Sequence, residues 1–475
     1  MIGATGAAKA SGFICQLALA WFLTKEDYGV YAIAISLAVF LSVLRDGGLP
    51  QVLEQKGKRF DQFAGPSFWM MLTMNGATAL LVTLIAQPAA KFYGIPELAG
   101  VMTLFALTIP LSVLPSLLSV RLVVNLQFRE LGLVQVVSAL SRNALLLFFA
   151  WEGFGARSFL LPVLITSATD SLLLWLITRF SPWAMAPKVR IWPELFAGGR
   201  WVLLGTFSIA VGNNGSYFVL GKLLPSELVG TYFFAYQLIV QLGVLLSDNV
   251  YQVLVGSFAR MGGELSRIRA AVPRALGVIV LIGAAASLLI GAIYEPLERA
   301  LWHGKWAGAT DAVQILAVVW PAIAGVSVLR ALQMATGHFR QWGVVTLIGA
   351  LASVAGAALG AYWGGSATTT ALGFGFGALL GAALNAAVAL PHIGIRAADA
   401  GLSVLHPWVV VAAAAACARY AGTLFSLAWI GAAAAGACFC ILGYFGLMVF
   451  ARDSLILVEN SLQRILGGIA RPPSR

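Results

Sequence analysis

The stretch that decides the fold occurs twice: residues 23–31 read LTKEDYGVY, and residues 224–232 read LPSELVGTY. Four positions are identical at an offset of 201, namely Leu23/Leu224, Glu26/Glu227, Gly29/Gly230 and Tyr31/Tyr232. The same offset aligns QVL at 51–53 with QVL at 252–254, and FRELG at 128–132 aligns with FRQWG at 339–343 at an offset of 211. Three blocks in the same order indicate an internal repeat.

The composition indicates that this repeat lies in a membrane. Hydrophobic residues make up 60% of the 475 residues and charged residues only 10%, whereas a soluble domain has about a quarter of its residues charged. A bilayer core needs roughly 20 apolar residues per helix. We therefore predict an all-α polytopic membrane protein with about fourteen spans, near 2–23, 29–44, 64–87, 98–120, 131–150, 158–178, 201–221, 229–250, 271–294, 311–334, 343–362, 367–390, 403–420 and 424–450.

The repeat and the spans together predict the domain organisation. Six spans separate equivalent positions, so the two halves have the same orientation, which implies a pseudo-two-fold axis along the membrane normal and a substrate path between the halves. We predict an N-lobe over 1–180, a cytoplasmic linker over 181–197, a C-lobe over 198–390, an appended helix pair over 391–450 and an amphipathic tail over 451–475 on the inner surface.

Lysine and arginine positions predict the orientation. With the N-terminus inside, 22 of the 30 basic residues fall in inside segments and seven in outside segments. The positive-inside rule therefore predicts that both termini are cytoplasmic. The net charge of +11 does not indicate nucleic-acid binding, because the basic residues form short clusters between apolar runs. Met1 aligns with Val202, so we expect the first helix to lack the basic and aromatic turn that precedes its counterpart, as an internal start codon would cause.

Enzymatic and metal chemistry are not expected. The longest predicted loop has about twenty residues, which leaves no room for a soluble catalytic or ATPase domain. The four cysteines lie in apolar runs and the four histidines are scattered, so no metal site and no cofactor are predicted.

One buried charge pair is a candidate for substrate chemistry. Arg142 and Asp170 lie at similar depth in adjacent antiparallel spans, where a charge costs about 2.5–3.5 kcal/mol. One interpretation is an ion pair that joins the two helices; the other is that Arg142 meets an anionic substrate while Asp170 holds it or titrates.

Polar and charged residues elsewhere give further candidates. Side chains with amides or hydroxyls can bind sugar hydroxyls, because they offer both donors and acceptors, and they also form interhelical hydrogen bonds. The candidates of this kind are Gln16, Asn213, Asn214, Tyr217, Gln237 and Gln241. Four residues at inside helix ends are candidate gate contacts or interface anchors: Arg45, Asp46, Asp248 and Arg330. Glycines at 356, 360 and 364, and at 373, 377 and 381, predict close helix packing.

The segment 23–55, LTKEDYGVYAIAISLAVFLSVLRDGGLPQVLEQ, resembles the opening hairpin of the bacterial polysaccharide-exporter family, the Wzx-type flippases of the multidrug/oligosaccharidyl-lipid/polysaccharide superfamily. FRELG and FRQWG are similar to that family's pattern at the starts of helices 5 and 11. The resemblance implies an inner-membrane flippase that moves an undecaprenyl-diphosphate-linked oligosaccharide to the periplasmic leaflet by alternating access.

The resemblance also has implications for partners and binding. It implies a polysaccharide polymerase and assembly proteins as partners, and an apolar groove for the lipid tail within 403–450. Arg142 is the nearest counterpart of the basic cavity residues in related flippases. Two alternatives remain open at this point: a small-molecule or drug exporter, which typically has twelve helices, and a membrane-embedded polymerase or ligase, which usually has a large outside loop.

Overall fold

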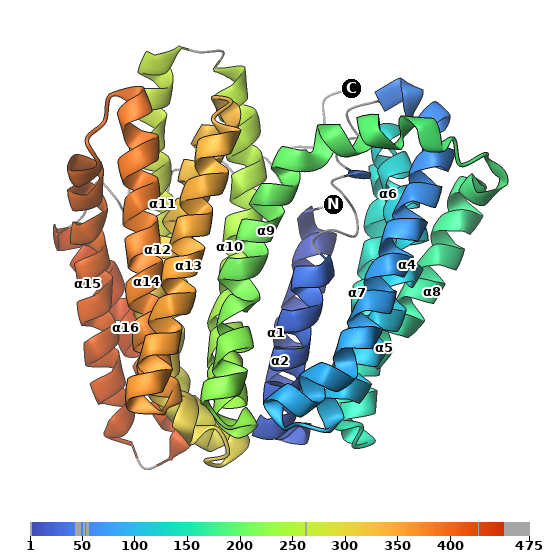
Figure 1. Cartoon of the computed structure of the whole chain (residues 1–475). Coiled ribbons are helices and arrows are strands. Elements are labelled where there is room, and N and C mark those ends of the chain that lie inside the picture. Colours follow the sequence, from blue (N-terminus) through green and yellow to red (C-terminus); the bar gives the residue numbers. More distant parts are fainter. Residues whose placement is uncertain are drawn as a thin grey trace. The chain divides into compact units, whose positions relative to one another are not determined.

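The computed structural model describes residues 2–42, 49–50, 53, 57–261, 264–425 and 427–450, and these ranges contain helices and no strand (Figure 1). The chain divides into two compact units, Met1–Phe233 (unit 1) and Phe234–Arg475 (unit 2). The α-helices are α1 Ile2–Phe22, α2 Lys25–Ser42, α4 Phe60–Tyr93, α5 Glu97–Leu111, α6 Val113–Val124, α7 Phe128–Trp151, α8 Leu161–Thr178, α9 Trp192–Leu223, α10 Ser226–Arg260, α11 Leu265–Trp302, α12 Thr310–Ala335, α13 Phe339–Gly364, α14 Ala367–Ala389, α15 Ala397–Thr423 and α16 Ala428–Phe450. Short 3-10 turns are η1 Gly57–Arg59, η2 Gly155–Phe159, η3 Pro182–Ala184, η4 Val189–Ile191, η5 Ala307–Ala309 and η6 Leu390–Ile393.

Each of the fourteen predicted apolar segments overlaps a helix, which confirms an all-α polytopic membrane protein. Within the described ranges, nine helices are long and apolar enough to cross a membrane. One helix outside that set is α2, whose 18 residues begin with Lys25, Glu26 and Asp27. The number of crossings remains a prediction.

The predicted span 98–120 is not one continuous helix, because α5 ends at Leu111 and α6 begins at Val113. Pro115 has no backbone N–H to donate to the Leu111 carbonyl four residues earlier, so the helical hydrogen-bond pattern is broken there. At the break, the Ile109 carbonyl accepts from both the backbone N–H of Ser112 at 3.2 Å and the Ser112 hydroxyl at 2.7 Å.

Two apolar clusters lie among the helices in the described part of unit 1. In the first, α4 packs against α6 through Met71 and Leu117, which are fully buried. In the second, Leu118 of α6 meets Val134 of α7 and Leu174 of α8. Burying a leucine contributes about 1.5–3 kcal/mol in water. In lipid the gain comes from packing.

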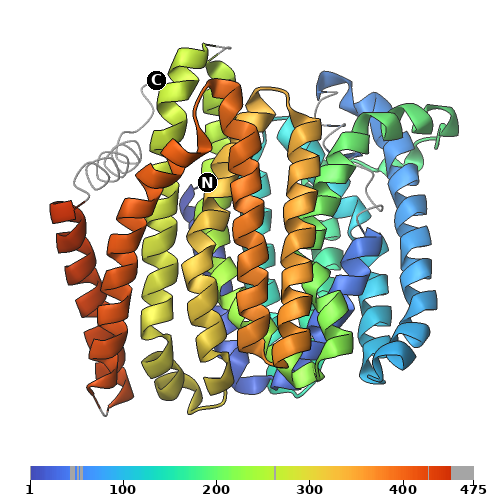
Figure 2. The same cartoon turned by 60° about the vertical axis from the view of Figure 1, so that its left-hand side comes forward.

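Unit 2 is organised around α11, which contacts α12, α15 and α16. Val272 and Leu276 of α11 face Val328 and Leu332 of α12 in one buried cluster. Toward the other end of α11, Leu288 packs with Val411 of α15 and Phe439 of α16. Figure 2 shows α15 and α16, coloured red, side by side.

The glycine spacing in α13 and α14 produces the predicted close packing. A Cβ atom added to Gly356 would overlap the Gly373 carbonyl, and one added to Gly373 would overlap the Gly356 carbonyl. A Cβ on Gly349 would lie 2.8 Å from the Cα of Gly381, closer than real Cβ atoms approach. The two backbones therefore touch along several turns, as small residues at every fourth position allow. The predicted amphipathic tail lies outside the described residues.

Candidate functional site

The beginnings of α2 and α10 cross within unit 1 at two glycines that are equivalent in the sequence repeat. A Cβ atom on Gly29 would overlap the carbonyl of Ser226, and a Cβ on Gly230 would overlap the carbonyl of Lys25. Lys25 and Ser226 are themselves equivalent at the offset of 201. The contact is therefore reciprocal, as a local two-fold relation requires.

Polar contacts around this crossing repeat the reciprocity. The Lys25 ammonium lies 3.3 Å from a carboxylate oxygen of Glu227. At the equivalent positions, the Ser226 hydroxyl donates to Glu26 at 3.5 Å. The side chains of Lys25 and Glu227 are 28% and 64% exposed, and an ion pair so exposed contributes at most about 1 kcal/mol. The crossing is thus close but only weakly held by charge.

A cluster of aromatic rings packs next to the crossing and is also within unit 1. The ring of Tyr31 stacks on Phe159 with centroids 4.1 Å apart. The ring centroids of Tyr28 and Tyr31 each lie about 6 Å from that of Phe233. Tyr217 joins the cluster at 5.2 Å from Phe233. The sequence signal for this cluster was that a tyrosine occupies both equivalent positions of the repeat, Tyr31 and Tyr232.

Tyr217, which was predicted to lie on a polar cavity surface, is placed by the structure among aromatic rings. Its side chain is 1% exposed and lies among rings, including Tyr232 at 5.9 Å. A tyrosine can bury its ring and leave only its hydroxyl to find a partner, so residue type alone did not distinguish the two surroundings.

Arg142 and Asp170 do not form an ion pair in the described part of the chain. The Asp170 carboxylate instead accepts a hydrogen bond from Ser138 of α7 at 2.8 Å. Its other oxygen is buried without a hydrogen-bond partner among the described residues. The Arg142 side chain is exposed on α7 and is near enough for charge interaction with the Asp170 carboxylate. The structure therefore leaves the guanidinium accessible for a ligand.

The region beside Arg142 holds a polar contact between α1 and α7. The Asn143 side chain donates to the Ser11 hydroxyl at 2.9 Å, and the Cys15 thiol lies 3.5 Å from the Asn143 carbonyl. Gln16, which follows on α1, is 7% exposed and its amide nitrogen has no hydrogen-bond partner in the described ranges. Gln16 and Arg142 thus remain candidates on neighbouring helices of one unit.

The other predicted amides have mixed surroundings. Asn213 is exposed on α9, while Asn214 is half-buried and donates to the Ala210 carbonyl of its own helix at 3.4 Å. Gln237 and Gln241 are half-buried on α10 and share a face at i, i+4 spacing.

The gate candidates are placed only in part. Arg45 and Asp46 lie outside the described residues, and Asp248 lies in α10 with its side chain outside them. Arg330 is half-buried on α12, with its guanidinium 5.0 Å from the centroid of Trp342. This is a cation–π distance.

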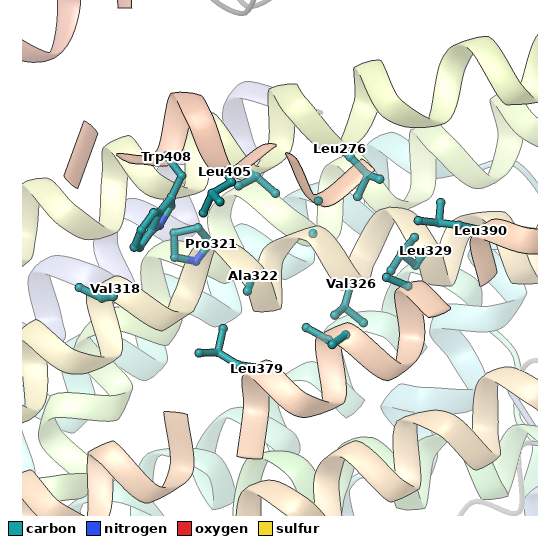
Figure 3. A pocket seen from close by; sticks show the side chains of 16 residues that line it. Leu276, Val318, Pro321, Ala322, Val326, Leu329, Leu379, Leu390, Leu405 and Trp408 are labelled. Carbon is teal, nitrogen blue, oxygen red and sulfur yellow. The ribbon is translucent and has the colours of Figure 1, made fainter. Parts of the chain in front are cut away.

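Unit 2 contains an apolar cavity of about 540 Å³ that four helices line. Pro321, Val326 and Leu329 come from α12, and Leu405 and Trp408 come from α15. The remaining wall is formed by Leu276 and Val280 of α11 and by Leu379 and Leu390 at α14 and its end (Figure 3). Ligand sites commonly have volumes of this size and apolar walls. Of the range 403–450, in which a groove for a lipid tail was predicted, α15 contributes Leu405 and Trp408 to this cavity.

No group of three histidine, cysteine or carboxylate side chains that could hold a metal occurs among the residues the structure describes.

Comparison with known proteins places these features in a family. Residues 18–311 match the family described as polysaccharide biosynthesis protein. The chain is 23% identical over 315 residues to the succinoglycan biosynthesis transport protein ExoT of Rhizobium meliloti (strain 1021), covering 64% of this chain and 62% of that protein. It is 20% identical over 318 residues to the lipopolysaccharide biosynthesis protein WzxC of Escherichia coli (strain K12), covering 65% and 63%. The chain thus matches less than two thirds of the length of each relative.

The fold is similar to solved transporters of very different sequence. The lipid II flippase MurJ in an inward closed conformation superposes with a TM-score of 0.73 and 12% identity, over 95% of this chain and 98% of that one. An inward-facing multidrug resistance transporter of the MATE family gives a TM-score of 0.64 and 12% identity, over 81% and 94%. At this identity the likeness shows the fold alone.

Proposed function

Because this chain belongs to the polysaccharide biosynthesis protein family, we propose that it is a flippase for a lipid-linked oligosaccharide. It is a multi-pass protein of the bacterial inner membrane. It moves an undecaprenyl-diphosphate-linked saccharide from the cytoplasmic to the periplasmic leaflet by alternating access. The observation that carries the proposal is the family match over residues 18–311. The transport and lipopolysaccharide names of its relatives support it.

The same proposal includes the finer topology. Fourteen spans form two like-oriented six-helix repeats and an appended pair, with both termini in the cytoplasm. The reciprocal contact at Gly29 and Gly230 supports a two-fold relation between the repeats. In this proposal the crossing is the outer gate, which must separate when the substrate leaves toward the periplasm.

Two features of the chain suit the two ends of such a substrate. Arg142 is an exposed cation on a membrane helix, and a guanidinium binds phosphate oxygens through paired N–H donors. The apolar cavity between α11, α12, α14 and α15 offers hydrocarbon walls to a polyprenyl tail. We therefore propose Arg142 for the diphosphate and this cavity for the tail.

Complementation of a flippase-null strain, with analysis of the accumulated lipid-linked intermediate, tests the function. The wild-type gene should restore polysaccharide export and remove the intermediate. Arg142→Ala and Arg142→Glu should each reduce export at least tenfold, because a hydrogen bond to a charged group contributes about 1.5–3 kcal/mol. Arg129→Ala, at the exposed start of the same helix, is the matched control and should export normally. Full export by both Arg142 variants would overturn that assignment and leave the function itself intact.

The cavity assignment has its own test. Val326→Trp fills the cavity from α12 and should lower export several-fold without lowering folded yield. Val344→Trp, at a 42% exposed position on α13, adds the same bulk outside the cavity and should not. Equal export by both variants would contradict the tail site.

The alternative that the sequence left open is a small-molecule exporter, and a multidrug transporter shares the fold at 12% identity. Expression in a drug-sensitive strain distinguishes the two. Restored drug resistance, together with failure to clear the lipid-linked intermediate, would replace the proposed function by this one.

A further inference from the structure

A second pocket, an open groove on the protein surface, lies where α10 ends and α11 begins, wholly within unit 2. Its walls carry three arginines and no acidic residue; they are Ser257, Arg260, Met261, Arg267, Ala270, Ala271 and Arg274. It lies apart from the apolar cavity, since none of its residues lines both. Its charge marks it as a site for anions.

The sequence of α11 explains why the arginines converge. Arg267, Ala271 and Arg274 follow one another at i, i+4 and i+7, which places them on a single helix face. The small side chains of Ala270 and Ala271 leave space between the two guanidinium groups. Ile268 and Val272 of the same helix are buried in the core of unit 2.

The three arginines are only lightly engaged with the protein. Arg260 at the end of α10 donates to the Gly256 carbonyl of its own helix at 3.1 Å, which orients its side chain. Arg267 lies 3.3 Å from Glu264, but the two side chains are 68% and 59% exposed, so this pair is weak. No ion pair joins Arg274 to an acidic residue in the described part of the chain. Arg260 and Arg267 each use their Nε–H in these contacts, and their remaining guanidinium N–H groups can donate to an anion.

The place of the pocket in the chain selects the kind of anion. Arg260, Arg267 and Arg274 lie at the end of the helices that the positive-inside rule assigns to the cytoplasm. Directly beyond Arg274, α11 continues as an apolar helix long enough to span a bilayer. A ligand held here thus meets cations at one end and a hydrocarbon environment beyond. Basic cavities between membrane helices bind anionic lipid headgroups in this way.

We propose that the pocket formed by Arg260, Arg267 and Arg274 binds the phosphate headgroup of an anionic lipid from the adjoining leaflet. Each guanidinium presents a planar fork of donors that matches phosphate oxygens. The site is separate from Arg142 and from the apolar cavity, and it does not depend on the proposed transport function.

Native mass spectrometry of the purified full-length protein in detergent, titrated with phosphatidylglycerol, tests this site. Arg267→Gln with Arg274→Gln should weaken retention of phosphatidylglycerol about 25-fold, because each basic residue near an anionic surface contributes about fivefold. Arg267→Lys with Arg274→Lys keeps the charge and should lose less. Arg269→Gln is the matched control, because it removes one charge from the same helix at a residue outside the pocket. The Arg269 guanidinium points to Gly394 instead and would lie 3.5 Å from a Cβ atom added there.

Three outcomes would overturn the proposal. The first is unchanged retention by the Arg267/Arg274 double variant. The second is an equal loss in Arg269→Gln, which would indicate attraction by surface charge in general. The third outcome concerns two other ligands. If the wild-type protein retains phosphatidylcholine, or inorganic phosphate at equal concentration, as strongly as it retains phosphatidylglycerol, an anionic lipid is not the preferred ligand.

Discussion

Two helix pairs in this molecule approach until their backbones touch, and they do so differently. In unit 2, α13 and α14 contact each other through Gly349, Gly356 and Gly360 over several turns. In unit 1, the backbones of α2 and α10 meet near the start of both helices, at Gly29 and Gly230. Weakly held polar side chains surround the second contact. We propose from this comparison that the first pair is a permanent joint and that the second separates during transport.

The largest effect should come from fixing the α2–α10 crossing in place. Lys25→Cys with Glu227→Cys, joined through two disulfide bonds by a short bis-methanethiosulfonate cross-linker in a background without the four native cysteines, should abolish export, and a reductant that cleaves these disulfides should restore it. The reason is that an outer gate must open in every transport cycle. The measurement is polysaccharide export before and after reduction.

Glu295→Cys with Arg299→Cys is the control, because that ion pair of 3.0 Å lies within one helix and its cross-link should leave export unchanged. Export that persists through the Lys25–Glu227 cross-link would show that the crossing does not open.

Disrupting the α13–α14 joint should act on folding. Gly356→Leu should destabilise the protein by about 3 kcal/mol, because the added side chain meets the Gly373 backbone and cannot be accommodated. Denaturation of the purified protein in detergent measures the change. Gly436→Leu on α16, where an added Cβ meets nothing within 4 Å, should be near neutral. If Gly356→Leu is as stable as wild type, the joint is not permanent and the contrast between the two pairs fails.

A milder change at the crossing should act on transport and spare folding. Gly29→Ala places a methyl group against the Ser226 carbonyl, so we expect the crossing to open and export to fall about fivefold. Folded yield should hold, since alanine gains about 1 kcal/mol over glycine in a helix. Gly12→Ala on α1, whose Cβ would meet only Asn143 at 4.0 Å, should export normally. Loss of folded yield in Gly29→Ala alone would make the crossing a structural joint like α13–α14.

The smallest effect should come from the ion pair beside the crossing. Lys25→Ala removes an exposed interaction of at most about 1 kcal/mol, so export should change less than fivefold. Lys25→Arg should be indistinguishable from wild type in the same assay. A loss as large as that caused by the cross-link would show that this pair, and not the glycine contact, holds the crossing closed.

Much of the fold was predictable from the sequence because it depends on local properties of the chain. Runs of about 20 apolar residues predicted segments that all overlap helices, and the glycines at every fourth position predicted the α13–α14 contact. The break at Ser112 was missed, although Pro115 carried its signal, because the prediction counted hydropathy and not lost hydrogen bonds.

The candidate site was less predictable because it depends on how helices are rotated and spaced. Adjacent helices and equal depth suggested an Arg142–Asp170 pair, but Ser138 is the group that reaches Asp170. Tyr217 was grouped with the amides by polarity, yet its ring is buried among aromatic residues. Side chains on neighbouring helices meet only when both helix faces are turned toward each other, and a single sequence does not give that angle.

By itself, then, the sequence determined that the chain is helical and has membrane-spanning apolar segments, and it predicted an internal repeat, because hydropathy and self-similarity are properties of the linear sequence. Only the tertiary structure decided that repeat-equivalent Gly29 and Gly230 meet each other and that α11, α12, α14 and α15 enclose an apolar cavity. Contacts between residues about 200 positions apart depend on the packing of whole helices, where shape and spacing in three dimensions select the partners.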